Sequence, residues 1–430
     1  IMKTIPSLSV DVDGNVQLRN ATPQIFVDGR PTTLTLDQIP ADIIDKIEII
    51  TNPSAKFDAS GGTAGIINVV LKKNKRNGYN GNVRLGVDSR GRFNGGGDIN
   101  YREGKINFFA SGMLFQRKTI SNSYAGTSFK TSSPLSVISN SDNTGEGQMA
   151  FLRGGLDYFV DNRNTISIAA NVNRGMMDND ATQLIDTTTT SLFSHVNRTT
   201  ASSFDFRNFG GQLSYKHNFM KNGHSISADI NYNSSNNTNN SDIKSLIYSA
   251  PYTLKYPTYQ QRSLGDGYNK FLTLQSDYEN QLGENKKLEA GVRVAMREFS
   301  TNSLQYINTN TSNTGYVLSA RSSSKYKFFD NVYAAYTTYS FKQKKFTYQL
   351  GLRLESSNYN GNLLKLSGAD SAKFKVDYPV SLFPSAFITY KITDKQDLQL
   401  NFSRRINRPS FFQLLPVYDF SDPQNPSVGN

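Results

Sequence analysis

Several residue types are scarce in this chain of 430 residues, which has no cysteine, no tryptophan and three histidines. Without cysteine the chain has neither a disulfide framework nor the thiolate ligands that many zinc sites use. His195, His217 and His224 lack the spacing of metal ligands, so we expect surface histidines. The sequence therefore predicts no metal site and no cofactor.

Long hydrophobic runs are also missing. The longest apolar stretch, residues 65–71, is far shorter than the roughly 20 residues that a membrane-spanning helix needs. Hydrophobic residues make up 37% of the chain, and its mean hydropathy is −0.50. These values exclude a helical membrane protein. They do not exclude a membrane β-barrel, because a barrel strand needs apolar residues on one face only.

Catalytic and phosphate-binding motifs are absent as well. No nucleophile elbow of the G-x-S-x-G type occurs. The glycines at 95–97 lie in a predicted strand with no helix after it, so they do not form a phosphate loop. We therefore expect no enzyme. A catalytic group at a barrel rim remains an alternative, and it predicts that His195→Ala abolishes an activity.

The formal net charge is +12. Lysine and arginine are scattered singly, and neither a basic helix nor a zinc-finger spacing is present, so nucleic acid is not the expected partner. Anionic lipid headgroups or sugar phosphates fit this charge better, and ordinary solvated surface charge is the alternative.

A strict alternation of apolar and polar residues dominates the chain after residue 78. It is clearest at 226–233, 288–297 and 346–355, and a period of two places every apolar residue on one face of a strand. The chain is rich in aromatic residues, with 27 Phe and 23 Tyr, which suits the aromatic girdles of a membrane barrel. A soluble sheet rich in tyrosine is the alternative.

The connections between these strands alternate between short and long, which is typical of membrane barrels. We expect about thirteen strands. The predicted short turns are 102–105, 160–164, 219–223, 282–285, 341–345 and 392–395, and the predicted long polar loops are 118–143, 174–200, 234–265, 300–324 and 360–377. Charged residues on the polar strand faces would be costly against lipid, so we expect them to face the lumen: Glu289, Arg293, Arg297, Arg353 and Glu355.

The first part of the chain has a different pattern. Residues 5–19 predict a hairpin with its turn at Asp13-Gly14. Further strands are predicted at 24–27, 47–50 and 66–71, and a short helix at 36–44. A basic, polar hinge follows at 72–77. We therefore divide the chain into a small mixed α/β domain at 1–75 and a barrel domain at 76–430, the fold class being mostly β.

Three stretches of the first domain carry a family resemblance: IPSLSVDVDGNVQLRN, IFVDGRP and IPADIIDKIEIITNPSAKFDASGGTAGIINVVLKK. They resemble the plug of TonB-dependent outer-membrane receptors in order, spacing and chain position. RRINRP at 404–409 and YDFSDPQN at 418–425 resemble the Bacteroidetes branch of outer-membrane barrels. The chain departs from the family pattern at Asn20, where glycine is usual, and at Thr51-Asn52-Pro53, where Arg-Gly-Pro is common. It also differs from the starch-utilisation branch, so a dedicated lipoprotein lid is less expected.

The resemblance implies a receptor in the outer membrane of a Gram-negative bacterium that imports a scarce nutrient by energy-coupled movement of the plug. It implies a TonB-type energy-coupling protein and outer-membrane lipids as partners, with a surface lipoprotein possible. Arg19 and Glu48 match plug–barrel charge contacts of the family. The positions expected to face substrate are Asn20, Ala21, Arg30, Thr32 and Thr33 on the plug, with Arg408 from the barrel.

The alternative function is a receptor-like barrel that serves as a structural or assembly scaffold. A signal peptide and a TonB-contacting segment upstream would favour transport over this role. About thirteen strands are too few to enclose a plug, so we expect the sequence to be the C-terminal part of a plug with about the first half of a 22-stranded barrel.

Overall fold

The computed structural model describes strands and their short connections. The described residues are 8–10, 16–18, 23–27, 30–31, 44–50, 55, 66–71, 78–129, 135–189, 193–249, 253–254, 259–308, 315–320, 322–364, 370–393, 396–406, 408, 418–419 and 427–428. Within these ranges all regular elements are strands, and no helix that could cross a membrane is found. The segment predicted to be helical, 36–44, lies outside the described residues except for its last residue, which begins a strand.

The strands of the N-terminal region agree with the sequence pattern. β1 (Leu8–Val10) pairs antiparallel with β2 (Val16–Leu18), as the hairpin prediction requires. A separate sheet has the order β4-β3-β6-β5. Its strands are β3 (Gln24–Val27), β4 (Arg30–Pro31), β5 (Ile44–Ile50) and β6 (Ile66–Leu71).

This plug sheet is mixed, because β3 and β6 run parallel while the other pairs are antiparallel. A parallel strand pair needs a crossover connection, and here the crossover contains β5. The central strand β6 is apolar and buried, with Ile66, Ile67 and Val69 fully buried beside Phe26 of β3. These side chains form the core of the plug region.

Thirteen strands follow one another side by side in a large antiparallel sheet, and two short strands, β14 (Thr253–Leu254) and β17 (Val317–Leu318), pair at its margin. The thirteen are β7 (Gly78–Val87), β8 (Phe93–Glu103), β9 (Ile106–Phe129), β10 (Leu135–Phe159), β11 (Asn164–Thr188), β12 (Phe193–Asn218), β13 (His224–Ser249), β15 (Tyr259–Gly283), β16 (Lys286–Asn308), β18 (Ser324–Gln343), β19 (Phe346–Leu364), β20 (Asp370–Thr393) and β21 (Gln396–Ser403). A further pair, β22 (Tyr418–Asp419) and β23 (Ser427–Val428), stands apart.

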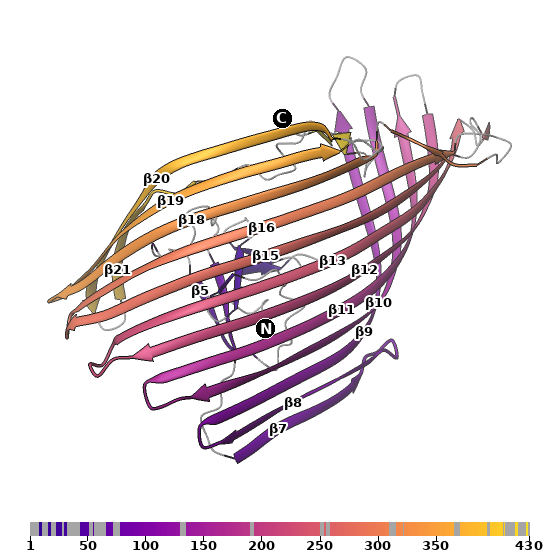
Figure 1. Ribbon diagram of the computed structural model, residues 1–430. Coiled ribbons are helices and arrows are strands. Elements are labelled where there is room, and N and C mark those ends of the chain that lie inside the picture. Colours follow the sequence, from indigo (N-terminus) through magenta and orange to yellow (C-terminus); the bar gives the residue numbers. More distant parts are fainter. Residues whose placement is uncertain are drawn as a thin grey trace.

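The large sheet forms a curved wall around the plug sheet (Figure 1). Each of its strands pairs with its neighbours in the sequence, as in an up-and-down barrel. Its edge strands β7 and β21 do not pair with each other among the described residues. The fold is thus a transmembrane antiparallel β-barrel wall, incomplete in this chain, around a small plug.

The two faces of the wall differ as the alternation predicts. In β19, Leu350, Leu352 and Leu354 are 49%, 41% and 40% exposed, whereas Arg353 and Glu355 are each 1% exposed. Because alternate residues of a strand point to opposite faces, the leucines lie on the outer face and the charged residues on the inner face. The predicted lumen orientation of these charges is therefore confirmed.

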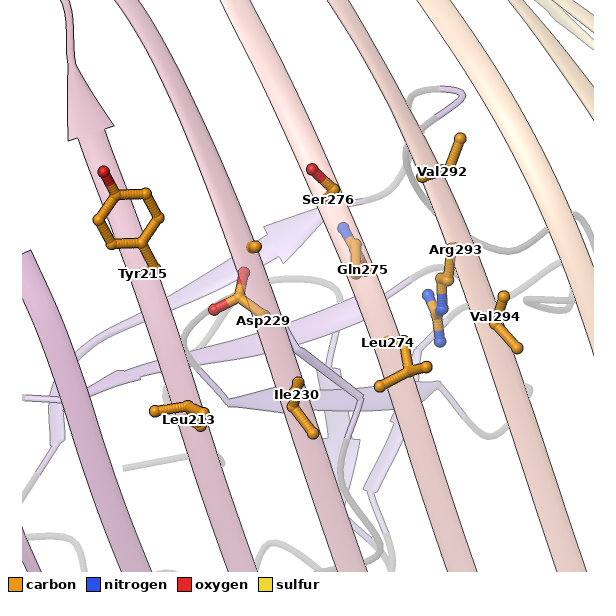
Figure 2. Close-up of a pocket in the computed structure, with 11 residues that line it drawn as sticks. Leu213, Tyr215, Asp229, Ile230, Leu274, Gln275, Ser276, Val292, Arg293 and Val294 are labelled. Carbon is orange, nitrogen blue, oxygen red and sulfur yellow. The ribbon is translucent and has the colours of Figure 1, made fainter.

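The outer face also carries a shallow apolar depression. Its large lining side chains include Leu213, Tyr215, Ile230 and Leu274 (Figure 2). They belong to the lipid-facing rows of β12, β13 and β15. The plug strands lie behind the wall in Figure 2. This depression is part of the membrane-facing surface.

Four of the five predicted long loops are wrong, because most of each of these segments is strand. Residues 118–143, for example, form the end of β9 and the start of β10, and their ladder pairs Lys118 with Glu146 and Phe129 with Leu135. Segments 174–200, 234–265 and 360–377 likewise consist largely of strand residues, whereas 300–324 holds the end of β16, the short β17 and the first residue of β18. Beyond the membrane both faces of a strand meet water, so the alternation ends, but backbone pairing continues because it needs no apolar face.

The short turns are where the sequence predicts them. In the turn after β10, the backbone N–H groups of Arg163 and Asn164 donate to the Asp161 carboxylate over 2.7 and 2.8 Å. These bonds, with that of Arg163 first, lower the pKa of Asp161. They also replace ladder bonds in a turn of only a few residues.

Candidate functional site: the lumen face of the wall at the plug

The plug and the wall come close together at two small residues, Ala55 and Gly351. A Cβ on Gly351 of β19 would lie 3.1 Å from the Cβ of Ala55 in the plug, and Ala55 is 6% exposed. Beside it, the Arg353 Nη1 donates to the Ala55 carbonyl oxygen over 3.5 Å. The same Cβ would lie 2.5 Å from the Ser385 hydroxyl oxygen of β20, so glycine at 351 leaves room for both the neighbouring strand and the plug.

Arg353 belongs to a buried charge cluster with Glu355 of β19 and with Arg408, which follows β21. Its Nε donates to Glu355 Oε2 over 2.6 Å, and Arg408 Nη2 lies 2.5 Å from Glu355 Oε1. The side chains are 1%, 0% and 4% exposed. One carboxylate is thus paired with two guanidinium groups where water has little access, and it accepts a hydrogen bond from Arg353. Such charge-assisted bonds are stronger than neutral ones.

A second polar group lies on the inner face, in the same ladder row as Arg353. The Tyr336 hydroxyl donates to Asp277, and Gln275 Nε2 donates to the other Asp277 oxygen over 2.9 Å. Tyr336 reaches across β16 because Gly291 stands opposite it in the ladder, and a Cβ there would lie 2.3 Å from the tyrosine oxygen. The Arg353 guanidinium lies 6.0 Å from the Tyr336 ring centroid, which links the two groups.

Above the charge cluster the lumen face becomes aromatic. Tyr326, Phe328 and Tyr359 form a buried core, with further apolar side chains packed against it. Arg297 Nη2 donates to Asp330 Oδ2 over 2.7 Å in the next row of the same face. The inner wall thus offers paired charges beside the plug and aromatic rings beyond it.

The predicted site residues fall into two groups. Arg408 is described, and it is buried against Glu355. Glu48 is also described: Asn68 Nδ2 donates to it over 2.8 Å and Lys46 Nζ lies 2.7 Å away, so its contacts are within the plug. Arg30 begins β4, but its side chain is not described. The remaining predicted positions lie outside the described residues: Arg19, Asn20, Ala21, Thr32 and Thr33.

Sequence reasoning identified the charged wall residues but missed their partners. Tyr336 and Asp277 share the inward parity of Arg353, and this was the signal available for them. No sequence pattern could identify Ala55, because it contacts Arg353 through its backbone carbonyl oxygen and not through its side chain. The contact joins residues 298 positions apart, and such a distance leaves no local pattern.

The histidines do not form a metal centre. Among the residues that the structure describes, no group of three or more His, Cys, Asp or Glu side chains could hold a metal ion. His195 Nδ1 lies 2.6 Å from Asp186 Oδ1, its direct partner in the ladder. His217 and His224 both pack against Phe219 at the short turn after β12, with ring centroids 4.6 and 3.9 Å apart.

Comparisons with known proteins agree with this architecture. Residues 217–430 match the outer membrane protein beta-barrel family, whereas no curated protein sequence matches the chain. The unliganded ferric citrate transporter FecA has a similar fold, with 13% identity and a TM-score of 0.56, over 94% of this chain and 59% of FecA. The ferric yersiniabactin uptake receptor FyuA from Yersinia pestis is 11% identical, with a TM-score of 0.37 over 93% of this chain and 82% of FyuA.

The TM-score to FecA establishes the fold, and this chain spans 59% of the FecA length. The match over residues 217–430 covers the wall from the end of β12 onward. Together with the lipid-facing rows and the lumen charges, these findings place the chain in the bacterial outer membrane. The protein is an outer-membrane β-barrel protein with the plug-and-barrel fold of TonB-dependent receptors, and its residues 217–430 match the outer membrane protein beta-barrel family.

Proposed function

We propose that the protein is a receptor that imports a scarce extracellular nutrient through its barrel by energy-coupled movement of the plug. The observation that carries this proposal is the contact of the plug with a charged inner wall, at Ala55 and Arg353. A plug held by polar contacts can exchange them for water when it moves. An iron chelate, a vitamin, a glycan and a peptide are the candidate substrates.

The plug must bind differently to the wall in its two states, because a ligand or partner shifts an equilibrium only by its differential affinity. Substrate would bind from the outside to the plug positions Asn20, Ala21, Arg30, Thr32 and Thr33. Arg408 would act through Glu355, because its contact with that carboxylate leaves little of its side chain exposed. Arg19 and Glu48 remain proposed plug–barrel contacts.

The proposed partners are a TonB-type energy-coupling protein on the periplasmic side, the lipids of the membrane and a possible surface lipoprotein. We propose no nucleic-acid partner and no catalytic role. The similar proteins named above are a transporter and an uptake receptor. The His195–Asp186 pair is accounted for by its position in the β11–β12 ladder, and no observation favours a scaffold.

A disulfide between plug and wall tests the proposal directly. The chain has no cysteine, and the 3.1 Å between Ala55 Cβ and a Cβ on Gly351 is close to the ~3.5–4.5 Å of a disulfide. In full-length Ala55→Cys/Gly351→Cys protein, oxidation should abolish uptake and leave substrate binding intact. Reduction should restore uptake.

The single variants Ala55→Cys and Gly351→Cys are the controls, since neither can form the cross-link. Uptake that continues in the oxidised double variant would show that plug movement at this point is not required. Deleting the gene and measuring growth on each candidate nutrient identifies the substrate. Unchanged growth on all of them would refute the transport role.

A further inference from the structure

Away from the short turns, the inner face of the wall is uncharged from β10 to β16. The ladder places the inward residues of these strands in rows, because every second residue of a strand points to the lumen. Five consecutive rows, which begin on β10 at Phe151 and end there at Asn143, contain no Asp, Glu, Lys or Arg from β10 to β16. Arg198, in the row that follows, is the next charge on this face. We call these five rows the neutral rows.

The opposite face of the same strand segments is charged. Glu146 of β10, Asp205 of β12 and Glu298 of β16 point outward, and each is paired with a lysine or an arginine. The lack of charge therefore belongs to the inner face and not to this part of the sequence as a whole. An ion that left water for the neutral rows would find no opposite charge there, and this is costly.

The first neutral row combines amide groups with aromatic rings. Its members from β10 to β20 are Phe151, Asn173, Asn208, Ser235, Asn269, Phe299, Phe328, Gly361 and Phe374. A Cβ on Gly361 would collide with the Phe374 ring. Glycine at this position therefore lets Phe374 stack on Phe328, with ring centroids 6.4 Å apart.

The asparagines of this row have unused hydrogen-bonding atoms. Asn173 is 0% exposed, and within the described part of the chain neither its Oδ1 nor its Nδ2 has a hydrogen-bond partner. The Oδ1 atoms of Asn208 and Asn269 are also buried and unpaired there. By contrast, Gln261 donates to Gln305 over 3.1 Å farther along the same face. Because buried polar atoms are normally paired, the asparagines require a partner that the described wall does not supply.

The chemistry of the row fits a carbohydrate. A hydroxyl group matches an amide, because each of them can both donate and accept a hydrogen bond. The C–H groups of a sugar ring can lie against the electron-rich face of an aromatic ring. An anionic iron chelate would need cations on the wall, and a free peptide carries a charge at each terminus. The neutral rows offer no counter-charge to either of them from β10 to β16.

We infer that the imported nutrient is an uncharged oligosaccharide, an inference that rests on the transport role proposed above. Its hydroxyl groups bind the amides of Asn173, Asn208 and Asn269. Its rings lie against Phe299 and Phe374, which are partly exposed, as is Asn269. The row is therefore open to the lumen on β15, β16 and β20.

Growth of a gene-deletion strain gives the first test. The carbon sources are maltoheptaose, cellohexaose, xylohexaose and mannohexaose, each supplied alone, and growth on at least one should be lost. Unchanged growth on all four would overturn the inference. If growth were then lost on a ferric chelate or a peptide, the transport role would stand without it. If growth were unchanged on every nutrient, the transport role would fail as well.

Binding to the full-length protein gives the second test, with isothermal titration of the same four oligosaccharides. Asn208→Leu/Asn269→Leu removes two amides and keeps the branched side-chain shape. It should weaken binding about fivefold for each amide. The matched control, Asn236→Leu/Asn240→Leu, changes two asparagines on the outer face of β13 and should bind like the native protein. Equal binding by the two variants would overturn the inference.

Two further readouts separate binding from a structural role and from charge. The stability of Asn208→Leu/Asn269→Leu should not fall, because the Oδ1 atoms that it removes are unpaired in the described wall. Lower stability with unchanged binding would show a structural role instead. Affinity should stay constant between about 0.05 and 0.5 M NaCl, since salt screens only charged partners, and a steep fall would overturn the inference. If the double variant does not fold, Asn269→Leu alone serves, because that residue is partly exposed.

Discussion

Glu355 is the residue whose replacement should destabilise the wall most. It is the carboxylate between Arg353 and Arg408, at 2.6 and 2.5 Å, and its side chain is 0% exposed. Glu355→Gln keeps the shape and removes the charge, so two buried guanidinium groups lose their counter-ion. Breaking a buried ion pair in this way costs about 3–5 kcal/mol of unfolding free energy.

The measurement is equilibrium unfolding of the refolded protein in lipid vesicles. Because the chain has no tryptophan, unfolding is followed by tyrosine fluorescence, or by the difference in gel mobility between heated and unheated samples. Glu289→Gln is the matched control on the same face of the wall. Its partner Lys287 lies 2.8 Å away, but both side chains are partly exposed, so we expect a loss below about 1 kcal/mol.

A second variant tests the cause of the effect. Replacing the whole cluster, as Arg353→Met/Glu355→Leu/Arg408→Met, should restore most of the stability lost in Glu355→Gln, since the three buried charges are removed together. Equal losses in Glu355→Gln and Glu289→Gln would refute the reasoning. So would a triple variant less stable than Glu355→Gln, because packing rather than charge would then explain the loss.

Two further predictions concern a close contact and a turn. Gly291→Ala should cost about 1–3 kcal/mol of unfolding free energy, because the added Cβ would collide with the Tyr336 hydroxyl. The control is Gly283→Ala, where the space around the added Cβ is open. Equal losses of stability in the two variants would contradict the prediction. The lowered pKa of Asp161 predicts that its turn is fully stabilised above the ordinary carboxyl pKa and loses this stabilisation as pH falls through the lowered value. Amide exchange of the turn at falling pH measures this loss, and Asp161→Asn should remove the pH dependence.

Much of the wall could be predicted from the sequence because one physical constraint acts on every membrane-spanning strand. The apolar face of β19 and the inward charges Arg353 and Glu355 follow from the period of two. The short turns follow from the same pattern, since polar residues interrupt it. In the plug, the strands at 24–27 and 66–71 matched because they are short apolar runs between turn residues.

The strand ends could not be predicted for the same reason. Where the strands leave the membrane, the lipid no longer selects one face, and Ser, Thr and Asn occupy both faces of a ladder that continues for many residues. The position of Arg408, which follows β21, depends on Glu355 of β19. The sequence indicated that Arg408 mattered, but not that a wall carboxylate would bury it.

The division of charge at the plug contact bears on how the plug could move. Among the described residues, Glu355 is paired with Arg353 and Arg408, and the plug contributes the carbonyl oxygen of Ala55, 3.5 Å from Arg353. Withdrawing the plug at this point would break a hydrogen bond to a charged group, worth about 1.5–3 kcal/mol. Had the plug supplied the carboxylate, withdrawal would leave buried charges unpaired, at about 3–5 kcal/mol. Among the described residues, the pairing of Glu355 with Arg353 and Arg408 does not depend on Ala55, which in the proposed transport cycle would lower the work that an energy-coupling partner must do.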